Sequence, residues 1–307
     1  MVRCTFSPAR AWRLAVGPAS TRTLGVAITT LVRTTMKTIS HDPSYVIHSD
    51  DEPLRLDRQA RIYGTEDDLR FIRLRADESV LDAGCGSGSA ARLFARHVPE
   101  GRVVGLDRDA SYLDYARRGA ATESLTNIEF QTGDVLSLPF KDASFDVVWS
   151  KHLLQWVARR REALSEFVRV ARPGGRVVCC NFDGFCLSHY PTDEQVQADV
   201  ERWFSRAEAE FGFDTNLGRK LPHLFKAAGL KDVRFEIIPD RAFCGFGGDA
   251  ERRWNWETQW QSAMPFTAKV FGSEAVAQEV AARIIQRFND PDVFVYTTLF
   301  YVEGTVP

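Results

Sequence analysis

A glycine-rich turn constrains the fold of this chain more than any other feature. The run VLDAGCGSGSA places Gly84, Gly86 and Gly88 directly after the short apolar segment 79–84 and at the start of a helical pattern over 87–97. Glycine adopts positive φ and has no Cβ, so a ligand can lie against the backbone there. The free N–H groups at the start of the helix suit an anionic group, either a pyrophosphate or an amino-acid carboxylate.

The spacing of the glycines narrows the ligand classes. A dinucleotide fingerprint reads G-x-G-x-x-G, whereas the third glycine here comes one residue early. No Gly-Lys-Ser or Gly-Lys-Thr follows, which excludes a P-loop for nucleotide triphosphates. The turn by itself still leaves both a dinucleotide and a sulfonium cofactor open.

Two aspartates follow the next two strand-like segments. Asp107 ends the segment 102–107, 19 residues past the last glycine, where a carboxylate can accept hydrogen bonds from both hydroxyls of a ribose. Asp134 follows the segment 127–133 and is placed to accept from an adenine amino group, with the Val135 N–H beside it. The alternatives are a helix N-cap for Asp107 and a turn aspartate for Asp134.

Strands and helices alternate along the chain. The β-branched runs are bounded by Gly and Pro and alternate with longer helical patterns, which predicts an α/β fold with a parallel sheet and helices on both faces. The predicted strands are 79–84, 102–107, 127–133, 145–150, 176–182, 232–238 and 294–303, and the predicted helices include 87–97, 110–123, 160–171 and 217–228.

Two further helical segments interrupt the alternation. Residues 191–210 form an amphipathic helix, and 249–290 form one or two helices rich in tryptophan. Insertions after the carboxyl ends of parallel strands lie on the rim where ligands bind, so we interpret both as a cap and not as a second domain. Trp254, Trp256 and Trp260 either wall a pocket for a bulky apolar or aromatic molecule or pin the cap to the sheet.

The first 40 residues differ from the rest in charge. They contain six basic residues and no Asp or Glu. This segment is either a mitochondrial transit peptide or, as we prefer, a disordered tail or translated upstream sequence with the true start at Met36. Residues 41–307 are expected to form one domain. Its expected parts are N-terminal cap helices (41–76), a cofactor-binding core (77–182) and cap insertions (183–214 and 241–292).

Composition and charge exclude several classes of protein. The net charge of −2 argues against a nucleic-acid binder, and no apolar run approaches the roughly 18 residues that span a bilayer. Six cysteines without a C-x-x-C pair fit free thiols in a reduced compartment. The histidines form no H-x-x-x-H or H-E-x-x-H pattern, so we expect no metal site. We expect a soluble cytoplasmic protein, or a mitochondrial one if the leader is a genuine transit peptide.

The order and spacing of several motifs now point to a family. The sequence VLDAGCGSG, then GLD, GD with Val135, LPF, FDVVWS and RVARPGG, over residues 79–182, resembles the small-molecule branch of the class I S-adenosylmethionine-dependent methyltransferases. That branch includes ubiquinone/menaquinone-type and natural-product enzymes. The resemblance implies a Rossmann-like, seven-stranded, mostly parallel sheet with an antiparallel last strand, and S-adenosylmethionine as the cofactor.

The resemblance also assigns roles to residues. The glycines would cradle the methionine part of the cofactor, Arg108 would lie near the adenine, and Ser150 and Lys151 would line the methionine moiety, largely by backbone. An N-terminal helix of the kind that covers the cofactor in several secondary-metabolite enzymes would present Arg55 or Gln59 to the cofactor carboxylate; otherwise Arg55 and Arg58 are solvated charges. The predicted cofactor-binding residues are Asp82, Gly84, Cys85, Gly86, Gly88, Asp107, Arg108, Asp134, Val135, Ser150, Lys151, Arg55 and Gln59.

Methyl transfer from a sulfonium is an in-line displacement that needs alignment and a dry site. A general base is needed only when the attacking atom holds a proton that must leave. His152, directly after the strand 145–150, is the first candidate base, unless it faces outward at a helix start. His189 is the second candidate, and Tyr45 would face the methyl group.

These observations predict methyl transfer from S-adenosylmethionine to carbon, nitrogen or oxygen of a small, apolar or aromatic metabolite, in secondary metabolism. The alternatives are a non-catalytic S-adenosylmethionine-binding protein and an NAD(P)-dependent oxidoreductase. The glycine spacing and the lack of a Tyr-x-x-x-Lys pair oppose the oxidoreductase. The expected partner is a small-molecule substrate, with no nucleic acid and no membrane span, and a homo-oligomer is left open.

Overall fold

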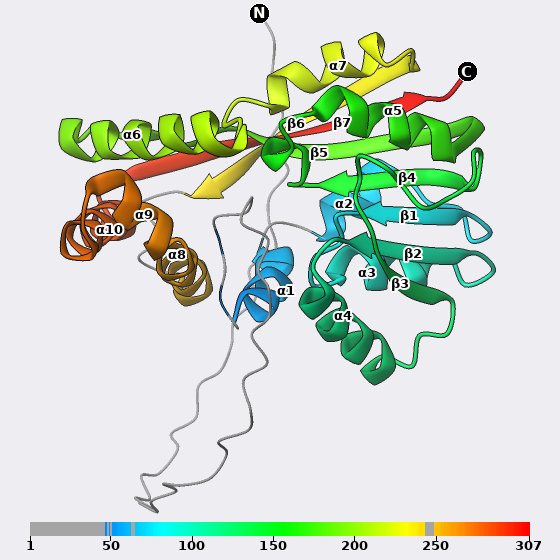
Figure 1. The fold of residues 1–307 in the computed structure, drawn as a ribbon, viewed down its shortest axis with the longest axis horizontal. Helices are drawn as coiled ribbons and strands as arrows, with labels where there is room; N and C mark the ends of the chain where they lie inside the picture. The colour runs from blue at the N-terminus through cyan, green and yellow to red at the C-terminus, as the bar shows by residue number, and fades with distance from the viewer. Residues whose placement is uncertain (1–46, 48, 50, 63–64, 243–248) are drawn as a thin grey trace, which may run out of the picture. The chain divides into compact units, whose positions relative to one another are not determined.

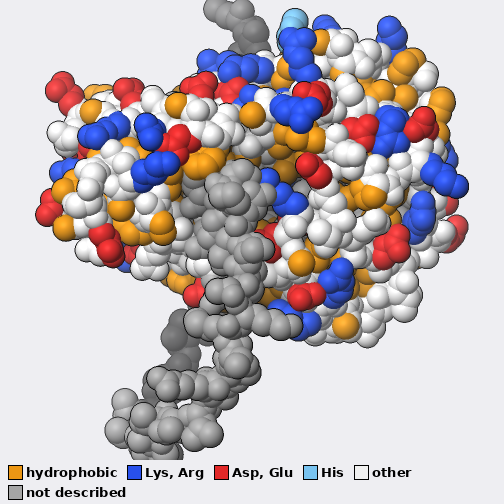
Figure 2. All heavy atoms as spheres, in the orientation of Figure 1, with side chains coloured by type: hydrophobic (Ala, Val, Ile, Leu, Met, Phe, Trp, Pro, Cys, Tyr) orange, Lys and Arg blue, Asp and Glu red, His pale blue; other side chains and the backbone are white. Residues whose placement is uncertain are grey.

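The computed structural model describes residues 47, 49, 51–62, 65–242 and 249–307, which belong to one compact unit. The predicted leader and Tyr45 lie outside the described residues. On the face drawn in Figure 2, basic and acidic side chains are interspersed. Among the described helices, none is long and apolar enough to cross a membrane.

The described strands form a seven-stranded sheet in the order β3-β2-β1-β4-β5-β7-β6 (Figure 1). The first five in that order pair in parallel, and β7 runs antiparallel between β5 and β6. This confirms the predicted Rossmann-like sheet with its antiparallel last strand. The order reverses between β1 and β4, where sheets of this kind bind ligands beyond their carboxyl ends. The strands are β1 (Ser79–Ala83), β2 (Arg102–Asp107), β3 (Ile128–Thr132), β4 (Phe145–Lys151), β5 (Ala171–Tyr190), β6 (Lys231–Ala242) and β7 (Phe294–Thr305).

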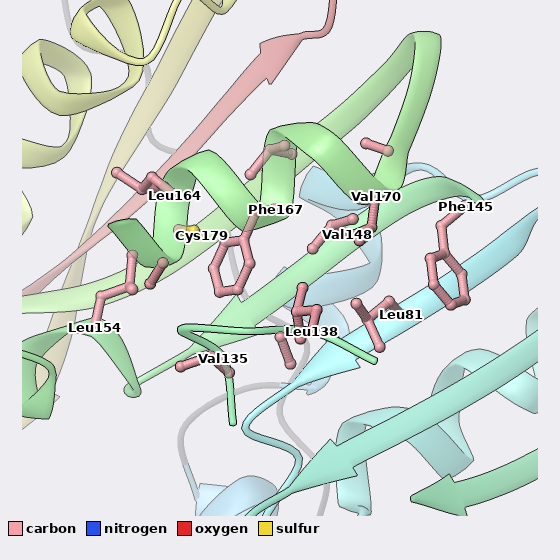
Figure 3. Close-up of a cluster of buried hydrophobic side chains, with 14 of the residues drawn as sticks. Leu81, Val135, Leu138, Phe145, Val148, Leu154, Leu164, Phe167, Val170 and Cys179 are labelled. Carbon is pink, nitrogen blue, oxygen red and sulfur yellow. The ribbon is translucent and has the colours of Figure 1, made fainter. Parts of the chain in front are cut away.

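Helices bury the central strands on both faces. The helices are α1 (Glu52–Ile62), α2 (Thr65–Ile72), α3 (Ser89–His97), α4 (Ala110–Thr122), α5 (Arg160–Val170), α6 (Glu194–Phe211), α7 (Leu221–Ala227), α8 (Ala250–Ser262), α9 (Met264–Phe271) and α10 (Glu274–Asn289). On one face, Leu81 and Val148 belong to the same buried cluster as Phe167 of α5 (Figure 3). On the other face, Trp149 packs edge-on against Phe94 of α3, with ring centroids 5.4 Å apart. The two middle strands are therefore buried almost throughout, as the apolar run FDVVWS predicts.

Local sequence explains where the elements depart from prediction. Segment 249–290 forms three described helices instead of the predicted one or two. Pro265 lies in the first turn of α9, Gly272 ends that helix at φ +96°, and the Ser273 side chain caps α10. Strand β5 begins earlier than predicted because Ala171 pairs with Phe145 before the register shifts.

Helices α6, α8, α9 and α10 lie together at one end of the sheet (Figure 1). Their buried side chains form one hydrophobic cluster, which also takes in Val295 of β7. Trp256 and Trp260 lie on one face of α8, as their spacing predicts, and both are buried in that core. The Trp260 ring meets the Trp203 ring of α6 edge-on, and Trp256 stacks on Phe288 of α10. These indoles therefore hold α8 against α6 and α10.

Candidate functional site

A cavity of about 220 Å³ lies where the carboxyl ends of β1, β2 and β4 meet. Its wall also takes side chains from α1 and Gln259 from α8, while Trp256 and Trp260 do not line it. The cavity brings together many of the residues that the sequence predicted to bind the cofactor or act in catalysis. The predicted residues in its wall are Arg55, Gln59, Asp82, Gly84, Cys85, Gly86, Asp107, Arg108, Lys151 and His152.

The glycine turn forms the floor of this cavity. Gly84, Gly86 and Gly88 all have positive φ, between 51° and 76°, which side chains rarely tolerate. The N–H of Gly84 donates to the Leu106 carbonyl at 2.8 Å, which ties the turn to β2. Gly84 and Gly86 line the cavity, whereas Gly88 does not: a Cβ there would lie 2.7 Å from that of Ala116. Gly88 is thus required for packing. At Gly86 a Cβ would meet only the end of the Leu56 side chain at 3.2 Å, whereas at Gly84 the Leu153 side chain already lies 2.8 Å from that position.

Asp107 is fixed by the turn that precedes it in the chain. Its Oδ2 accepts a hydrogen bond from the Gly86 N–H at 2.9 Å, and its Oδ1 accepts from the Asp109 N–H at 3.0 Å. Asp109, and not Asp107, is the N-cap of α4, because its Oδ1 accepts from the Ser111 N–H. Burial raises the pKa of the Asp107 carboxyl despite these two bonds. The helix-cap alternative for Asp107 is therefore wrong, and its carboxylate remains in the cavity wall.

Asp82, at the end of β1, is the least satisfied acid in the wall. Its side chain is only 2% exposed, and its Oδ2 has no hydrogen-bond partner among the described residues. Burial, followed by the nearby Asp107 carboxylate, raises the pKa of Asp82 to about 7.

A buried ion pair lies beside Asp82. Lys151 Nζ donates to both carboxylate oxygens of Asp68 at 2.8 Å, and the Tyr301 hydroxyl donates to Asp68 Oδ1 at 2.7 Å. The side chain of Lys151 is thus part of the site, whereas the backbone role assigned to this residue stays a prediction. The sequence prediction missed Asp68 and Tyr301, because one lies within the acidic run TEDDLR and the other within a strand that resembles any core strand.

His152 faces the cavity and not the solvent. Its backbone is left-handed (φ +57°) and its N–H donates to the Cys180 carbonyl at 2.9 Å. Its ring stacks on Phe182 of β5 with centroids 4.0 Å apart and planes 8° apart. Neither ring nitrogen has a hydrogen-bond partner among the described residues. Burial, then Lys151 and Arg55, lowers the pKa of His152 well below its usual value, so the imidazole is neutral.

Side chains of helix α1 form part of the cavity wall. Arg55 is only 2% exposed and donates to both carboxylate oxygens of Glu52 at 2.7 and 2.6 Å, to Asn255 of α8 at 2.9 Å and to Gln59. Arg58 lies over the Trp254 ring, 3.8 Å from its centroid. The expectation that these two arginines are solvated charges is therefore wrong for Arg55, since α1 docks on α8 through both.

Several predicted residues lie outside the cavity wall. Asp134 is exposed and its Oδ1 accepts from the Leu136 N–H in a turn, while Val135 and Ser150 are buried. The adenine and methionine roles assigned to these residues stay predictions. His189 does not line the cavity either, because β5 continues to residue 190 and places it against Phe288 of α10.

Comparisons with known proteins agree with this geometry. A methyltransferase domain model matches residues 81–179. The chain is 32% identical over 228 residues to an uncharacterized methyltransferase of Schizosaccharomyces pombe (72% of this chain, 80% of that one). It is 40% identical over 170 residues to the demethylmenaquinone methyltransferase of Lactococcus lactis (52% and 68%). An uncharacterized transposon protein of Streptomyces fradiae is 37% identical over 163 residues, and this chain spans 46% of it.

Solved structures show the same fold. The Haemonchus contortus phosphoethanolamine N-methyltransferase 2, in complex with phosphomonomethylethanolamine and S-adenosylhomocysteine, superimposes with a TM-score of 0.54 at 16% identity, over 85% of this chain and 58% of that one. The chain therefore belongs to the class I S-adenosylmethionine-dependent methyltransferases.

The described residues fit the cofactor of this family, S-adenosylmethionine. The wall has room for a ligand against the backbone at Gly86, and it holds carboxylates that suit hydroxyl and cationic groups. The buried Oδ2 of Asp82, without a partner among the described residues, is the oxygen that a cationic ligand would satisfy.

Proposed function

We propose that this methyltransferase acts on a small, apolar or aromatic metabolite that carries its own proton donor, a hydroxyl or N–H, and that His152 takes up that proton. The proposal extends to a role in secondary metabolism. The observation that supports the proposed proton transfer is the His152 imidazole. It is neutral and lies in the cavity wall without a hydrogen-bond partner among the described residues.

Cofactor binding would use the backbone of the turn and the acids around it. The space beside the Gly86 backbone would take the amino-acid part, and Asp107, already fixed by two backbone N–H groups, would accept from the ribose hydroxyls. When bound, S-adenosylmethionine supplies a methyl group activated by a positively charged sulfur. The protein aligns the acceptor and excludes water, which is what in-line displacement requires.

The acceptor would lie against an aromatic corner of the cavity. Phe182 and Trp156 line it together with Leu153, and Phe182 holds the His152 ring by stacking. Because the pKa of His152 is lowered well below its usual value, the ring is a hydrogen-bond acceptor at neutral pH. A hydroxyl or N–H of the acceptor would satisfy that nitrogen and would lose its proton to it as the methyl group moves.

Mass spectrometry of the reaction tests this proposal. The protein is incubated with S-adenosylmethionine and candidate acceptors. The spectra are then searched for S-adenosylhomocysteine and for an acceptor in which one methyl group has replaced a hydrogen. Quinols come first, because the Lactococcus lactis relative is named a demethylmenaquinone methyltransferase, followed by phenols and indoles. Cofactor binding without turnover on any of these would favour the non-catalytic alternative, and tight NADH binding would favour the oxidoreductase.

A substitution at His152 tests the proposed base. Asparagine tolerates the left-handed backbone at this position, so His152→Asn keeps the fold while removing the basic nitrogen. We expect kcat to fall about 100-fold or more, with the affinity for S-adenosylmethionine little changed. His223→Asn, on the exposed side of α7, is the matched control and should have no effect. Equal kcat values for His152→Asn and the wild type would exclude His152 as the base.

A further inference from the structure

The two ends of the cavity differ in the chemistry of their side chains. The end formed by β1 and β2 carries the acids Asp82 and Asp107. The other end is formed by the turn after β4, by Phe182 of β5 and by Gln259 of α8. The described side chains that these three segments place in the wall include no acid or base other than the His152 imidazole. This end therefore suits an uncharged acceptor that binds through rings and hydrogen bonds.

Gln155, in the turn after β4, places a buried amide in this end of the cavity. The residue is 5% exposed and lines the cavity. Its backbone carbonyl accepts a hydrogen bond from the Asp214 N–H at 2.9 Å, and the Trp156 N–H donates to the Leu153 carbonyl at 2.8 Å, so backbone bonds fix the turn. No described residue takes up its side-chain amide by a hydrogen bond. A ligand in the cavity can therefore pair with this amide.

The cations near His152 are already paired with acids of the chain. After burial, which is the larger cause, Lys151 and Arg55 lower the pKa of the His152 ring. Lys151 donates to both carboxylate oxygens of Asp68, and Arg55 donates to both of Glu52. An anionic substituent on the acceptor would have to compete with these buried carboxylates for a cation.

We infer that the acceptor is an uncharged molecule whose reacting hydroxyl is conjugated to a carbonyl group, and that Gln155 is the residue that selects it. The hydroxyl donates to the His152 ring nitrogen, and the carbonyl oxygen accepts a hydrogen bond from the Gln155 side-chain N–H. This inference rests on the proposed function and narrows its class of acceptor. Both side chains can reach one acceptor because they come from the same turn and line the same cavity.

The weak basicity of His152 explains why a conjugated carbonyl group matters. A buried, neutral imidazole takes a proton readily only from an acidic donor, because proton transfer is most efficient between groups of matched pKa. Conjugation lowers the pKa of the hydroxyl, since the charge of the ionised form is shared with the carbonyl oxygen. As the proton moves to the His152 nitrogen, negative charge develops on that carbonyl oxygen, where the Gln155 N–H stabilises it.

Binding of matched phenols to the full chain, saturated with S-adenosylhomocysteine, tests the inference by calorimetry. The three isomers of hydroxyacetophenone are compared with the three ethylphenols, in which a methylene group replaces the carbonyl. We expect the 2′ or the 4′ ketone to bind about tenfold or more tightly than its ethylphenol. The 3′ ketone, in which the two groups are not conjugated, should bind less tightly than the preferred isomer. Negatively charged 4-hydroxybenzoate should bind more weakly than 4′-hydroxyacetophenone.

Gln155→Leu removes the amide and keeps a side chain of similar size. The variant should bind the preferred ketone about tenfold or more weakly than the wild type, and the matching ethylphenol equally well. Its binding of S-adenosylhomocysteine shows that the cavity is still folded. Gln278→Leu, at an exposed glutamine on α10, is the matched control and should keep the preference of the wild type. The ultraviolet band of the bound ketone should shift to longer wavelength in the wild type and not in Gln155→Leu.

Three results would overturn the inference. The first is a wild type that binds no ketone more tightly than its ethylphenol, which includes binding none of these phenols. The second is a preference for the 3′ ketone or for 4-hydroxybenzoate, and the third is a preference for the ketone that persists in Gln155→Leu. Each of these leaves open a different hydroxyl or N–H acceptor for His152. The proposed function fails separately, if His152→Asn turns over as fast as the wild type.

Discussion

The contribution of a turn glycine to packing can be measured by a matched pair of glycine-to-alanine substitutions. Gly88 and Gly229 both have left-handed backbones, with φ of 73° and 88°. An added Cβ at Gly88 would lie 2.7 Å from Ala116 Cβ and 2.8 Å from the Phe130 ring, whereas at Gly229 nothing lies within 4 Å. The two variants therefore share the backbone strain and differ only in packing.

The structure sets the magnitude of each effect. Left-handed backbone costs an alanine about 1–2 kcal/mol, which is the whole expected loss for Gly229→Ala. At Gly88 the neighbours are a backbone-attached Cβ and a packed ring, so overpacking adds about 1–3 kcal/mol. We expect Gly88→Ala to lower the free energy of unfolding by about 3 kcal/mol or more, and by about 2 kcal/mol more than Gly229→Ala.

Urea denaturation followed by tryptophan fluorescence and circular dichroism measures both losses. The slope with urea should match the wild type in each variant, so that the shift in midpoint reports stability. Gly86→Ala adds a third case, since its Cβ would meet only the flexible end of Leu56 at 3.2 Å, in the cavity. That variant should lose cofactor affinity more than stability. Equal losses for Gly88→Ala and Gly229→Ala would refute the packing argument.

Two further predictions concern the buried charges. Lys151→Met leaves Asp68 buried without its cation and should lower the free energy of unfolding by about 3–5 kcal/mol. In thermal melts, the double variant Lys151→Met with Asp68→Leu should recover most of this lost stability. A double variant no more stable than Lys151→Met would show that loss of the ion pair is not the cause. Because the folded pKa of Asp82 is raised to about 7 from 3.8, its favourable contribution to stability is present below pH 4 and is lost as the pH rises through 7. Without ligand at pH 8, Asp82→Asn should therefore be more stable than the wild type by about 4 kcal/mol. Urea titrations at decreasing pH should show this difference in stability shrinking toward pH 4. A difference that does not change with pH would contradict the raised pKa of Asp82.

The fold followed from the sequence where local pattern and burial agree. Strand β2 occupies the predicted segment 102–107, because an apolar run between Gly101 and the Asp107 turn has no other favourable structure. Pro265 and Gly272 are the sequence signals for the helix boundaries within 249–290. Helical periodicity alone does not detect these boundaries. Here local turn chemistry overrides an almost continuous helical pattern.

Residues of the candidate site could be predicted only where they lie at, or directly after, the end of a strand. Asp107, Lys151 and His152 come directly after or at the ends of parallel strands, and the topology brings these ends together. The charged residues that pair with these side chains come from distant parts of the chain. Asp68, for example, is 83 residues from Lys151. Such pairings depend on how helices dock on the sheet, which no local spacing encodes. His189 lies outside the cavity wall for a related reason, because β5 continues past its predicted end.

The charges of the cavity resolve what the glycine turn left open. The turn alone admits both a dinucleotide and a sulfonium cofactor, since both place an anionic group near backbone N–H donors. In the folded protein, Arg55 and Lys151 are each engaged by a buried carboxylate of the chain itself. A pyrophosphate would then face the carboxyl groups of Asp82 and Asp107 across the cavity, and would meet like-charge repulsion from each of them when it is ionised. A ligand with ammonium and sulfonium charges meets the same acids favourably. The early third glycine and the acids in the cavity wall therefore favour the same cofactor for independent reasons.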